Sequence, residues 1–365
     1  MSDKKALSNG CFYLDIGEVK DFYQIGYIHG ETFKKEIREC IRLIKNEFGD
    51  DIKRVWQIFF HESTYVDDIK KYLPDVFEEF RGVCEGSGVE MNDLLILNCL
   101  DECYTILTER DPIGKCTAFG IRNDKSNTGM IGQNLDFMEM FDGYQTIFRI
   151  KSPLDGKVIV QYGFAGQIFG MGQNSEGLSV ASTTLINGSI NLFSGVPNTF
   201  VQKAILYCNS TEEAVKVLKK CPVSTATSWI ISDNNELMCI ETTANKVEVS
   251  NNRQVYTHTN HALYSSDIRS IKNICDLETF VVNSDGYTWE QTVERLECIN
   301  KKINVNTVDA IDVEYVKSTL LKEPVFRNYQ SKTLASVICT RENEKAYVYC
   351  GGSRKDGVFL KIEVV

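Results

Sequence analysis

Apolar residues recur at helical spacing over most of the first 110 residues of the chain. In Val19–Phe48 they stand at Phe22, Ile25, Ile28, Phe33, Ile37, Ile41 and Ile44. Similar patterns cover Val55–Phe60, Tyr65–Cys84 and Asp93–Leu107. Spacings of three and four residues are typical of amphipathic helices. We therefore predict a mostly helical N-terminal segment, in which Pro74 breaks or kinks the third helix, Asn92 caps the fourth and Glu85–Gly88 marks a helix end.

From Asp111 onward the pattern changes to short segments of alternating polarity, which is typical of strands. Cys116–Arg122 and Met130–Phe137 flank a polar loop and predict a hairpin. The other predicted strands are Tyr144–Ile150, Val158–Phe164, Leu178–Thr184, Ser228–Ser232, Leu237–Thr242, Gln254–His258, Thr333–Thr340, Ala346–Tyr349 and Val358–Ile362. Two helices should follow Thr184, the second opened by a capping box of Ser210 and Glu213.

Three more helices are expected at Ser266–Leu277, Trp289–Asn300 and Val308–Leu320. The glycine-containing stretch Gly166–Gly177 lacks the order of strand, glycine loop and helix that binds phosphates, so we interpret it as turns. Strands in groups with helices between them favour sheets covered by helices over an alternating array of strands and helices.

Composition and charge argue against several classes of binding partner. The 365 residues carry 40 Lys and Arg against 50 Asp and Glu, a formal charge of −10. An acidic balance argues against nucleic acid and anionic membranes as partners, because both need a basic surface. No run of about 18 apolar residues occurs, and the start of the chain lacks the apolar core of a signal peptide. We expect a soluble, cytoplasmic protein, and self-association into a homo-oligomer stays open.

The thirteen cysteines are odd in number and have no framework spacing. Without a secretion signal they are expected to be reduced thiols that act as small buried hydrophobic groups. No Cys-x-x-Cys pair supports a zinc site, and we predict no cofactor and no metal. Cys116 differs from the others because it follows a Pro and Gly turn and begins a predicted strand, although a small buried hydrophobic group is still the favoured interpretation from position alone.

Two other groups could work with that thiol. The hairpin should bring Asp136 or Asn134 close to Cys116, although an exposed loop carboxylate is the simpler interpretation of Asp136 alone. His258 and His261 could activate Cys116 from elsewhere in the chain, but ordinary hydrogen-bonded loop residues are the favoured interpretation. The two histidines are weak evidence for a metal site, because a His-x-x-His pair with no carboxylate motif nearby is common by chance.

Several segments taken together resemble the penicillin acyltransferase family, a branch of the N-terminal-nucleophile (Ntn) hydrolases. They are Phe80–Val89, Asp93–Asn98, Cys116–Gly120, Gly132–Phe137, Gln173–Leu178 and Thr259–His261, in the order found in the family. Related bile-salt hydrolases and ceramidases carry an Arg three residues before the Asp, where this chain has Gln133. The acyltransferase branch is the better match.

The resemblance implies an α+β fold of the αββα type, with two stacked antiparallel sheets between helical layers, preceded by the helical segment. It also implies self-cleavage that leaves Cys116 as an N-terminal nucleophile, with its own α-amine as general base and a small N-acyl amide or acyl thioester as substrate. The chain would then divide into residues 1–115 and the catalytic domain 116–365. Asp136 resembles the family's carboxylate near the nucleophile, Asn260 its oxyanion donor and Arg327 its active-site arginine.

One position departs from the family pattern. The residue before the nucleophile is typically Gly, which tolerates the strained backbone of self-cleavage, whereas this chain has Lys115. Two rival interpretations therefore stay open. One is a Cys-His amidase that is never cleaved, and the other is an inactive binding protein in which Lys115 blocks maturation.

Overall fold

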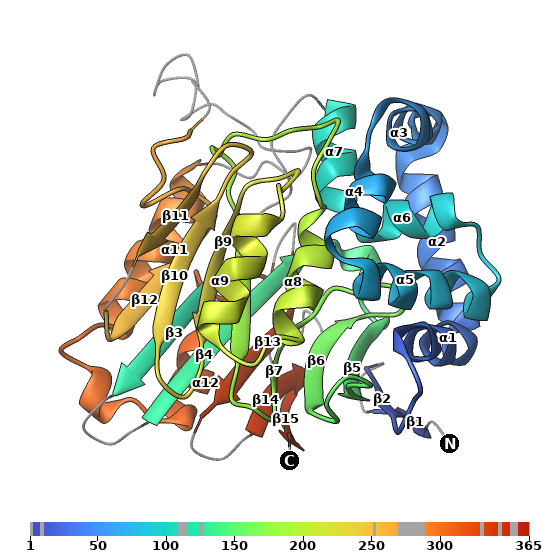
Figure 1. Cartoon of the computed structure of the whole chain (residues 1–365). Coiled ribbons are helices and arrows are strands. Elements are labelled where there is room, and N and C mark those ends of the chain that lie inside the picture. Colours follow the sequence, from blue (N-terminus) through green and yellow to red (C-terminus); the bar gives the residue numbers. More distant parts are fainter. Residues whose placement is uncertain are drawn as a thin grey trace.

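The computed structural model describes residues 3–7, 11–108, 116–123, 128–250, 253–268, 289–328, 332–341, 345–350 and 357–364. Lys115 and most of the predicted helix Ser266–Leu277 lie outside these residues. Within them, two β-sheets are stacked and flanked by helices, as Figure 1 shows. The predicted α+β class with an N-terminal helical segment is confirmed.

Seven α-helices make up most of the described N-terminal segment. They are α1 (Phe22–Thr32), α2 (Lys34–Phe48), α3 (Ile52–Gln57), α4 (Tyr65–Tyr72), α5 (Pro74–Ser87), α6 (Met91–Asn98) and α7 (Leu100–Thr108), with short helices at η2 (Gly49–Asp51) and η3 (Ile58–Glu62). The break expected at Pro74 is confirmed, because α4 ends before Leu73 and Pro74 opens α5. The helix end at Gly88 is also confirmed by its positive φ of 62°.

Glycines explain the close contact between α1 and α5. A Cβ atom at Gly26 would lie 1.8 Å from the backbone oxygen of Glu79, and one at Gly82 would lie 2.1 Å from that of Tyr23. Only glycine lets the two backbones approach so closely. The glycines therefore serve the packing of α1 on α5 and offset their poor helical propensity.

The larger sheet has nine strands in the order β1-β2-β5-β6-β7-β8-β9-β10-β11. Their bounds are β1 (Asp3–Ala6), β2 (Phe12–Ile16), β5 (Gln145–Lys151), β6 (Val158–Phe164), β7 (Met171–Asn174), β8 (Ser179–Thr184), β9 (Thr227–Ser232), β10 (Leu237–Thr242) and β11 (Val247–Ser250). All neighbours are antiparallel except β2 and β5, which are parallel.

The smaller sheet has six antiparallel strands in the order β12-β3-β4-β13-β14-β15. Their bounds are β12 (Val255–His258), β3 (Thr117–Asn123), β4 (Thr128–Phe137), β13 (Lys332–Thr340), β14 (Lys345–Cys350) and β15 (Val358–Glu363). The hairpin predicted around Cys116 is the pair of β3 and β4.

Helices cover both outer faces of the stacked sheets (Figure 1). α8 (Asn198–Leu206) and α9 (Thr211–Lys220) lie on the nine-stranded sheet, while α11 (Trp289–Lys302) and α12 (Val313–Leu320) lie on the six-stranded sheet. Short 3-10 helices are η4 (Glu139–Phe141) and η5 (Val308–Ala310). The sheets face each other through β3 and β4 on one side and β8 on the other. This is the four-layer αββα arrangement that the family resemblance implied.

Several local predictions were wrong. The stretch interpreted as turns contains β7, and β11 was missed, because each has only four residues. The chain begins with strands β1 and β2, not with a helix, and β2 pairs with β5 more than 100 residues away. The predicted helices Val19–Phe48 and Asp93–Leu107 are each broken, at Phe33 and at Cys99. Asn92 lies inside α6, whose N-cap is Glu90.

Among the described residues, no helix combines the length and the apolar character that a membrane span requires. The cysteines whose side chains are described are free thiols, and all but Cys298 are buried.

Candidate active site

Cys116 lies immediately before β3 and next to the end of β4. Pairing of Thr117 with Asn134 and of Ala118 with Gln133 sets the register of the hairpin. In this register Cys116 reaches the level of Leu135 and Asp136, as the sequence predicted. Its side chain is buried but lines a cavity of about 80 Å³.

The surroundings of Cys116 keep its thiol protonated. Burial, followed by the nearby charge of Asp136, raises its pKa to about 12. Hydrogen bonds from the Gln133 side chain and the Asp136 backbone, together with the charge of Arg295, lower the pKa of the thiol, but by less than burial and Asp136 raise it. Since the thiolate is the nucleophilic form, this thiol needs a base to take its proton during attack.

Asp136 is buried, and two residues hold its carboxylate. Oδ1 accepts a hydrogen bond from the Thr333 hydroxyl at 2.5 Å, and Oδ2 lies 3.9 Å from Nε of Arg327. Thr333 also accepts from the Arg327 backbone N–H at 2.8 Å. A register shift in β13 just after Thr333 occurs at this point of the sheet. The predicted residues Asp136 and Arg327 are therefore brought together beside Cys116.

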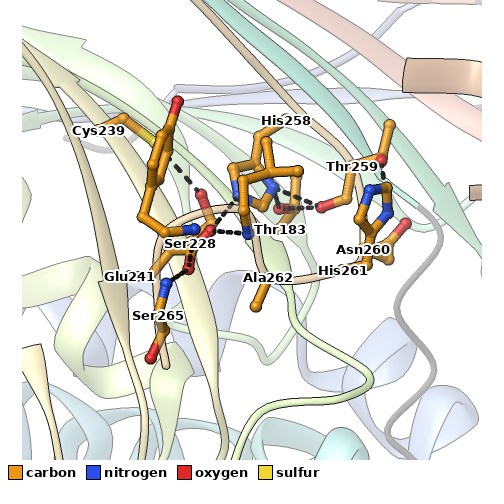
Figure 2. Close-up of polar contacts among 12 residues, drawn as sticks. Thr183, Ser228, Cys239, Glu241, His258, Thr259, Asn260, His261, Ala262 and Ser265 are labelled. Carbon is orange, nitrogen blue, oxygen red and sulfur yellow. Dashed lines mark hydrogen bonds and ion pairs between the residues drawn. The ribbon is translucent and has the colours of Figure 1, made fainter. Parts of the chain in front are cut away.

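Asn260 lies on the loop that follows β12, and the glutamate Glu241 of β10 holds this loop. The Glu241 carboxylate accepts hydrogen bonds from the backbone N–H groups of Leu263, Tyr264 and Ser265 at 2.6–3.0 Å. Figure 2 shows the carboxylate between Ser265 and His258, whose Nε2 lies 2.7 Å away. Burial alone would raise the pKa of Glu241, but these contacts together lower it.

The side chain of Asn260 is also fixed. Its Nδ2 donates to the backbone oxygen of Thr184 at 3.0 Å, and its Oδ1 accepts from Nη2 of Arg295 at 2.7 Å. These two contacts determine which end of the amide is the donor. Asn260 is completely buried and is not among the residues that line the cavity beside Cys116.

Arg295 connects Asn260 to the candidate nucleophile. Its Nη1 donates to the backbone oxygen of Cys116 at 2.6 Å and to the Thr117 hydroxyl at 2.8 Å. The side chain is 1% exposed and comes from α11. Arg295 thus joins two of the four predicted site residues, although it was not itself predicted as a site residue.

The two histidines occupy a different place. Both ring nitrogens of His258 have partners, Glu241 on one side and the Thr259 backbone oxygen on the other (Figure 2). His261 contacts the Thr292 hydroxyl, and burial, followed by the charge of His258, lowers its pKa to about 4. Neither histidine lines the cavity beside Cys116, and none of the hydrogen bonds among the described residues joins either to that thiol.

The remaining cavity lining comes from both sheets, from the N-terminal helices, from α8 and from the segment between β6 and β7. Gln133 contributes a side chain that exchanges two hydrogen bonds with the backbone of Ser182, at 2.6 and 2.8 Å. Asp101 and Glu102 of α7 also line the cavity. Among the described residues, no group of three or more His, Cys, Asp or Glu side chains is placed to hold a metal ion.

The sequence contains a pattern that could have identified Arg295 as a candidate site residue. Thr292, Arg295 and Ile299 form the buried face of α11. A single arginine on the apolar stripe of an otherwise polar helix needs a buried acceptor, and such a position is a candidate for a structural or functional role. Asp101 and Glu102 give a weaker signal, because acidic residues are common in the first turn of a helix.

Comparisons with known proteins show the family of this chain. The profile of the family "Acyl-coenzyme A:6-aminopenicillanic acid acyl-transferase" matches residues 122–355. A beta-alanyl-dopamine/carcinine hydrolase of Drosophila melanogaster is 25% identical over 227 residues, which span 58% of this chain and 58% of that protein, less than two thirds of its length. The 40 kDa form of acyl-coenzyme A:6-aminopenicillanic-acid-acyltransferase of Emericella nidulans is 24% identical over 251 residues, 66% of this chain and 67% of that protein.

Solved structures give more distant matches. A variant of conjugated bile acid hydrolase from Clostridium perfringens has 16% identity and a TM-score of 0.42, with 68% of this chain and 92% of that chain covered. Penicillin V acylase from Agrobacterium tumefaciens has 15% identity and the same TM-score, with 68% and 86% covered.

Proposed function

The chain belongs to the acyl-coenzyme A:6-aminopenicillanic acid acyl-transferase family of Ntn-type amide hydrolases and acyltransferases, and we propose that it is a cysteine enzyme that cuts its own chain before Cys116. The mature enzyme would cleave or transfer the acyl group of a small N-acyl compound. The names of both relatives, a hydrolase of beta-alanyl-dopamine and carcinine and an acyltransferase, support a small substrate of this class.

The observation that carries the proposal is that neither His258 nor His261 is placed to take the proton of the Cys116 thiol. Its pKa of about 12 leaves almost no thiolate at neutral pH. Both histidines have other partners and lie away from the cavity. Cleavage before Cys116 would create an α-amine on the same residue, with an ordinary pKa of about 7.7–8.0 that suits a base at neutral pH.

In the proposed reaction the α-amine takes the thiol proton as sulfur attacks the amide carbonyl. The new C–S bond gives a tetrahedral intermediate, which collapses as the C–N bond breaks and the leaving amine takes the proton from the α-ammonium group. Water or a second amine then attacks the thioester and releases the thiol. Asn260 is the proposed donor to the oxyanion, a role that its fixed amide suits.

Asp136 would hold the new α-ammonium group beside the sulfur. Its position next to Cys116 supports this role, and Arg327 and Thr333 keep its carboxylate in place. Arg327 would then be a positioning residue, since its contact is with Asp136. The two pieces should stay together after the cut, because β2 of the first pairs with β5 of the second.

Intact mass tests the proposal. Cleavage before Cys116 leaves 115 and 250 residues (365 − 115), or about 13 and 28 kDa in proportion to the 41.4 kDa chain. The larger piece should begin Cys-Thr-Ala-Phe-Gly, and both should elute together. Cys116→Ala should stay intact, whereas Cys298→Ala, a partly exposed thiol outside the cavity, should be cleaved normally.

The alternatives predict other results. A chain of 41.4 kDa that is fully active would favour a Cys-His amidase. An intact and inactive chain would favour a binding protein blocked at Lys115, in which case Lys115→Gly should start cleavage. If the wild type is cleaved slowly, Lys115→Gly should speed the cut, and an unchanged rate would remove Lys115 as the obstacle.

A further inference from the structure

The cavity beside Cys116 has charged residues of one sign only. Asp101, Glu102 and Asp136 line it, and no Lys, Arg or His does so among the described residues. Asp136 has Arg327 as its cationic neighbour. The described residues place no cation against Asp101 or Glu102, whose side-chain partners are hydroxyl groups.

Asp101 and Glu102 accept hydrogen bonds from the hydroxyl groups of three described residues. Oδ2 of Asp101 accepts from the Thr184 hydroxyl at 2.8 Å, and Oε1 of Glu102 accepts from Ser224 and Thr225 at 2.6 and 3.2 Å. Burial, followed by the charge of Glu102, raises the pKa of Asp101 to about 7, and burial raises that of Glu102. Glu102 is buried and the adjacent Asp101 is half-buried. Holding two such carboxylates side by side is costly, and a cation beside them would favour their charged forms.

Further hydrogen-bond acceptors line the same cavity. Gln167 is 5% exposed, and its Nε2 donates to the backbone oxygen of Leu97 at 2.8 Å. Its Oε1 has no hydrogen-bond partner among the described residues, and Oδ1 of Asn198 has none either. A buried amide oxygen without a donor is rare in folded proteins. Two oxygens of the lining therefore have no donor among the described residues, which is an observation separate from the charge of the cavity.

We propose that Asp101 and Glu102 bind an ammonium group of the substrate, a few atoms from the carbonyl that Cys116 attacks. An ammonium group brings one positive charge and three N–H donors, which matches a lining of carboxylates and unpaired oxygens. A metal ion fits less well, because the described residues offer no group of three or more ligating side chains. This inference rests on the proposed function of Cys116.

Thr184 places the ammonium site close to the reacting carbonyl. Its backbone oxygen accepts from Nδ2 of Asn260, and its hydroxyl donates to Asp101. Thr184 therefore contacts both Asn260, the proposed oxyanion donor, and Asp101, one of the two acidic residues. A short chain between the carbonyl and the amine is therefore expected.

Matched anilides test the inference. Butyryl and β-alanyl p-nitroanilide differ only in a methyl against an ammonium group, and propionyl and glycyl p-nitroanilide form a shorter pair. The mature wild type should prefer an ammonium substrate over its neutral partner by at least about tenfold in kcat/KM. Asp101→Asn and Glu102→Gln should each lower this ratio about tenfold or more. Asp67→Asn removes one negative charge from an exposed site and should leave the ratio unchanged.

The ammonium group could stand on the leaving amine instead of the acyl group. N-(2-aminoethyl)butanamide and N-propylbutanamide form the corresponding pair, and a preference for the first would support the inference equally. Ratios near one for every pair in the wild type would overturn it, even if both acidic variants fail to fold. Ratios that persist in folded Asp101→Asn and Glu102→Gln would overturn it as well.

A binding measurement separates this inference from the proposed function. β-Alaninamide should raise the melting temperature of the wild type more than butanamide does, and Asp101→Asn should lose the difference. If no anilide is hydrolysed but this difference is found, the proposed function fails and the ammonium site stands. If anilides are hydrolysed without a preference and the two amides shift the melting temperature equally, the ammonium site fails and the function stands.

Discussion

Arg295 donates one guanidinium N–H to the side-chain oxygen of Asn260 at 2.7 Å and another to the backbone oxygen of Cys116 at 2.6 Å. One buried cation from α11 therefore sets the distance between the residue that would attack the substrate and the residue that would bind the oxyanion. Catalysis depends on such placement, and a displacement of about 1 Å can cost about 100-fold in rate.

Arg295→Lys should lower kcat of the mature enzyme by about 10- to 100-fold with little change in KM. A lysine carries one compact ammonium group and cannot reproduce the planar fork that reaches both oxygens. Steady-state kinetics on cleaved protein measures the effect. Lys301→Arg, on an exposed part of the same helix, is the matched control and should behave as wild type. A normal kcat with a lower melting temperature would leave Arg295 with a structural role only.

Asn260→Ala should lower kcat by about 100- to 1,000-fold, the usual loss when an oxyanion donor is removed. The measurement needs protein that has already matured, because the same residue could also assist self-cleavage. A turn residue would behave differently, since its loss costs about 1 kcal/mol of folding free energy and leaves turnover nearly intact. A shifted melting temperature with unchanged turnover would contradict the oxyanion role.

The sequence was most informative where the contacts are local. Two alternating segments around a polar loop predicted the β3 and β4 hairpin, and the hairpin alone brings Asp136 to Cys116. Pro74 and Gly88 fix helix ends through their own backbone preferences. The order of these elements favoured sheets covered by helices, and the resemblance to the family implied two stacked sheets between helical layers.

Contacts between distant segments were not predictable in the same way. The pairing of β2 with β5 and the link from Arg295 to Cys116 join residues more than 100 positions apart, and no periodic pattern records them. β7 was missed because a four-residue strand between glycines has the composition of a turn. Asp101 and Glu102 were missed because a charged residue in the first turn of a helix is usually exposed.

His258→Gln and His261→Gln should each keep most of kcat in protein that folds. The α-amine of Cys116 is the proposed base, so losing an imidazole removes no proton transfer. His258→Gln should nonetheless be less stable, because it disturbs the Glu241 contact that holds the Asn260 loop (Figure 2). Turnover per folded, cleaved molecule is the quantity to compare. A loss of about 100-fold or more at either position would favour the Cys-His amidase.

His29 makes a pH-dependent contribution to the free energy of unfolding. It is buried on α1, and its Nε2 accepts a hydrogen bond from the Gly166 backbone N–H at 3.0 Å. Burial, followed by the charge of Lys203, lowers its pKa from 6.5 to about 3. Between these values the unfolded chain binds a proton at this histidine and the folded chain does not. The contribution to stability is thus complete above pH 6.5 and is lost as pH falls toward 3.

The total pH curve would not isolate this term, because Asp101 acts in the opposite direction. Its pKa of about 7 makes the folded chain bind a proton there before the unfolded chain does, so acid stabilises through that group. The difference between the wild type and His29→Gln removes the shared contributions. Relative to the variant, the wild type should lose up to about 1.4 kcal/mol of unfolding free energy for each pH unit below 6.5. Denaturant unfolding at pH 7.5, 6.0 and 5.0 measures this difference, with the exposed His61→Gln as control. A difference that stays constant across these values would show that His29 is protonated equally in both states.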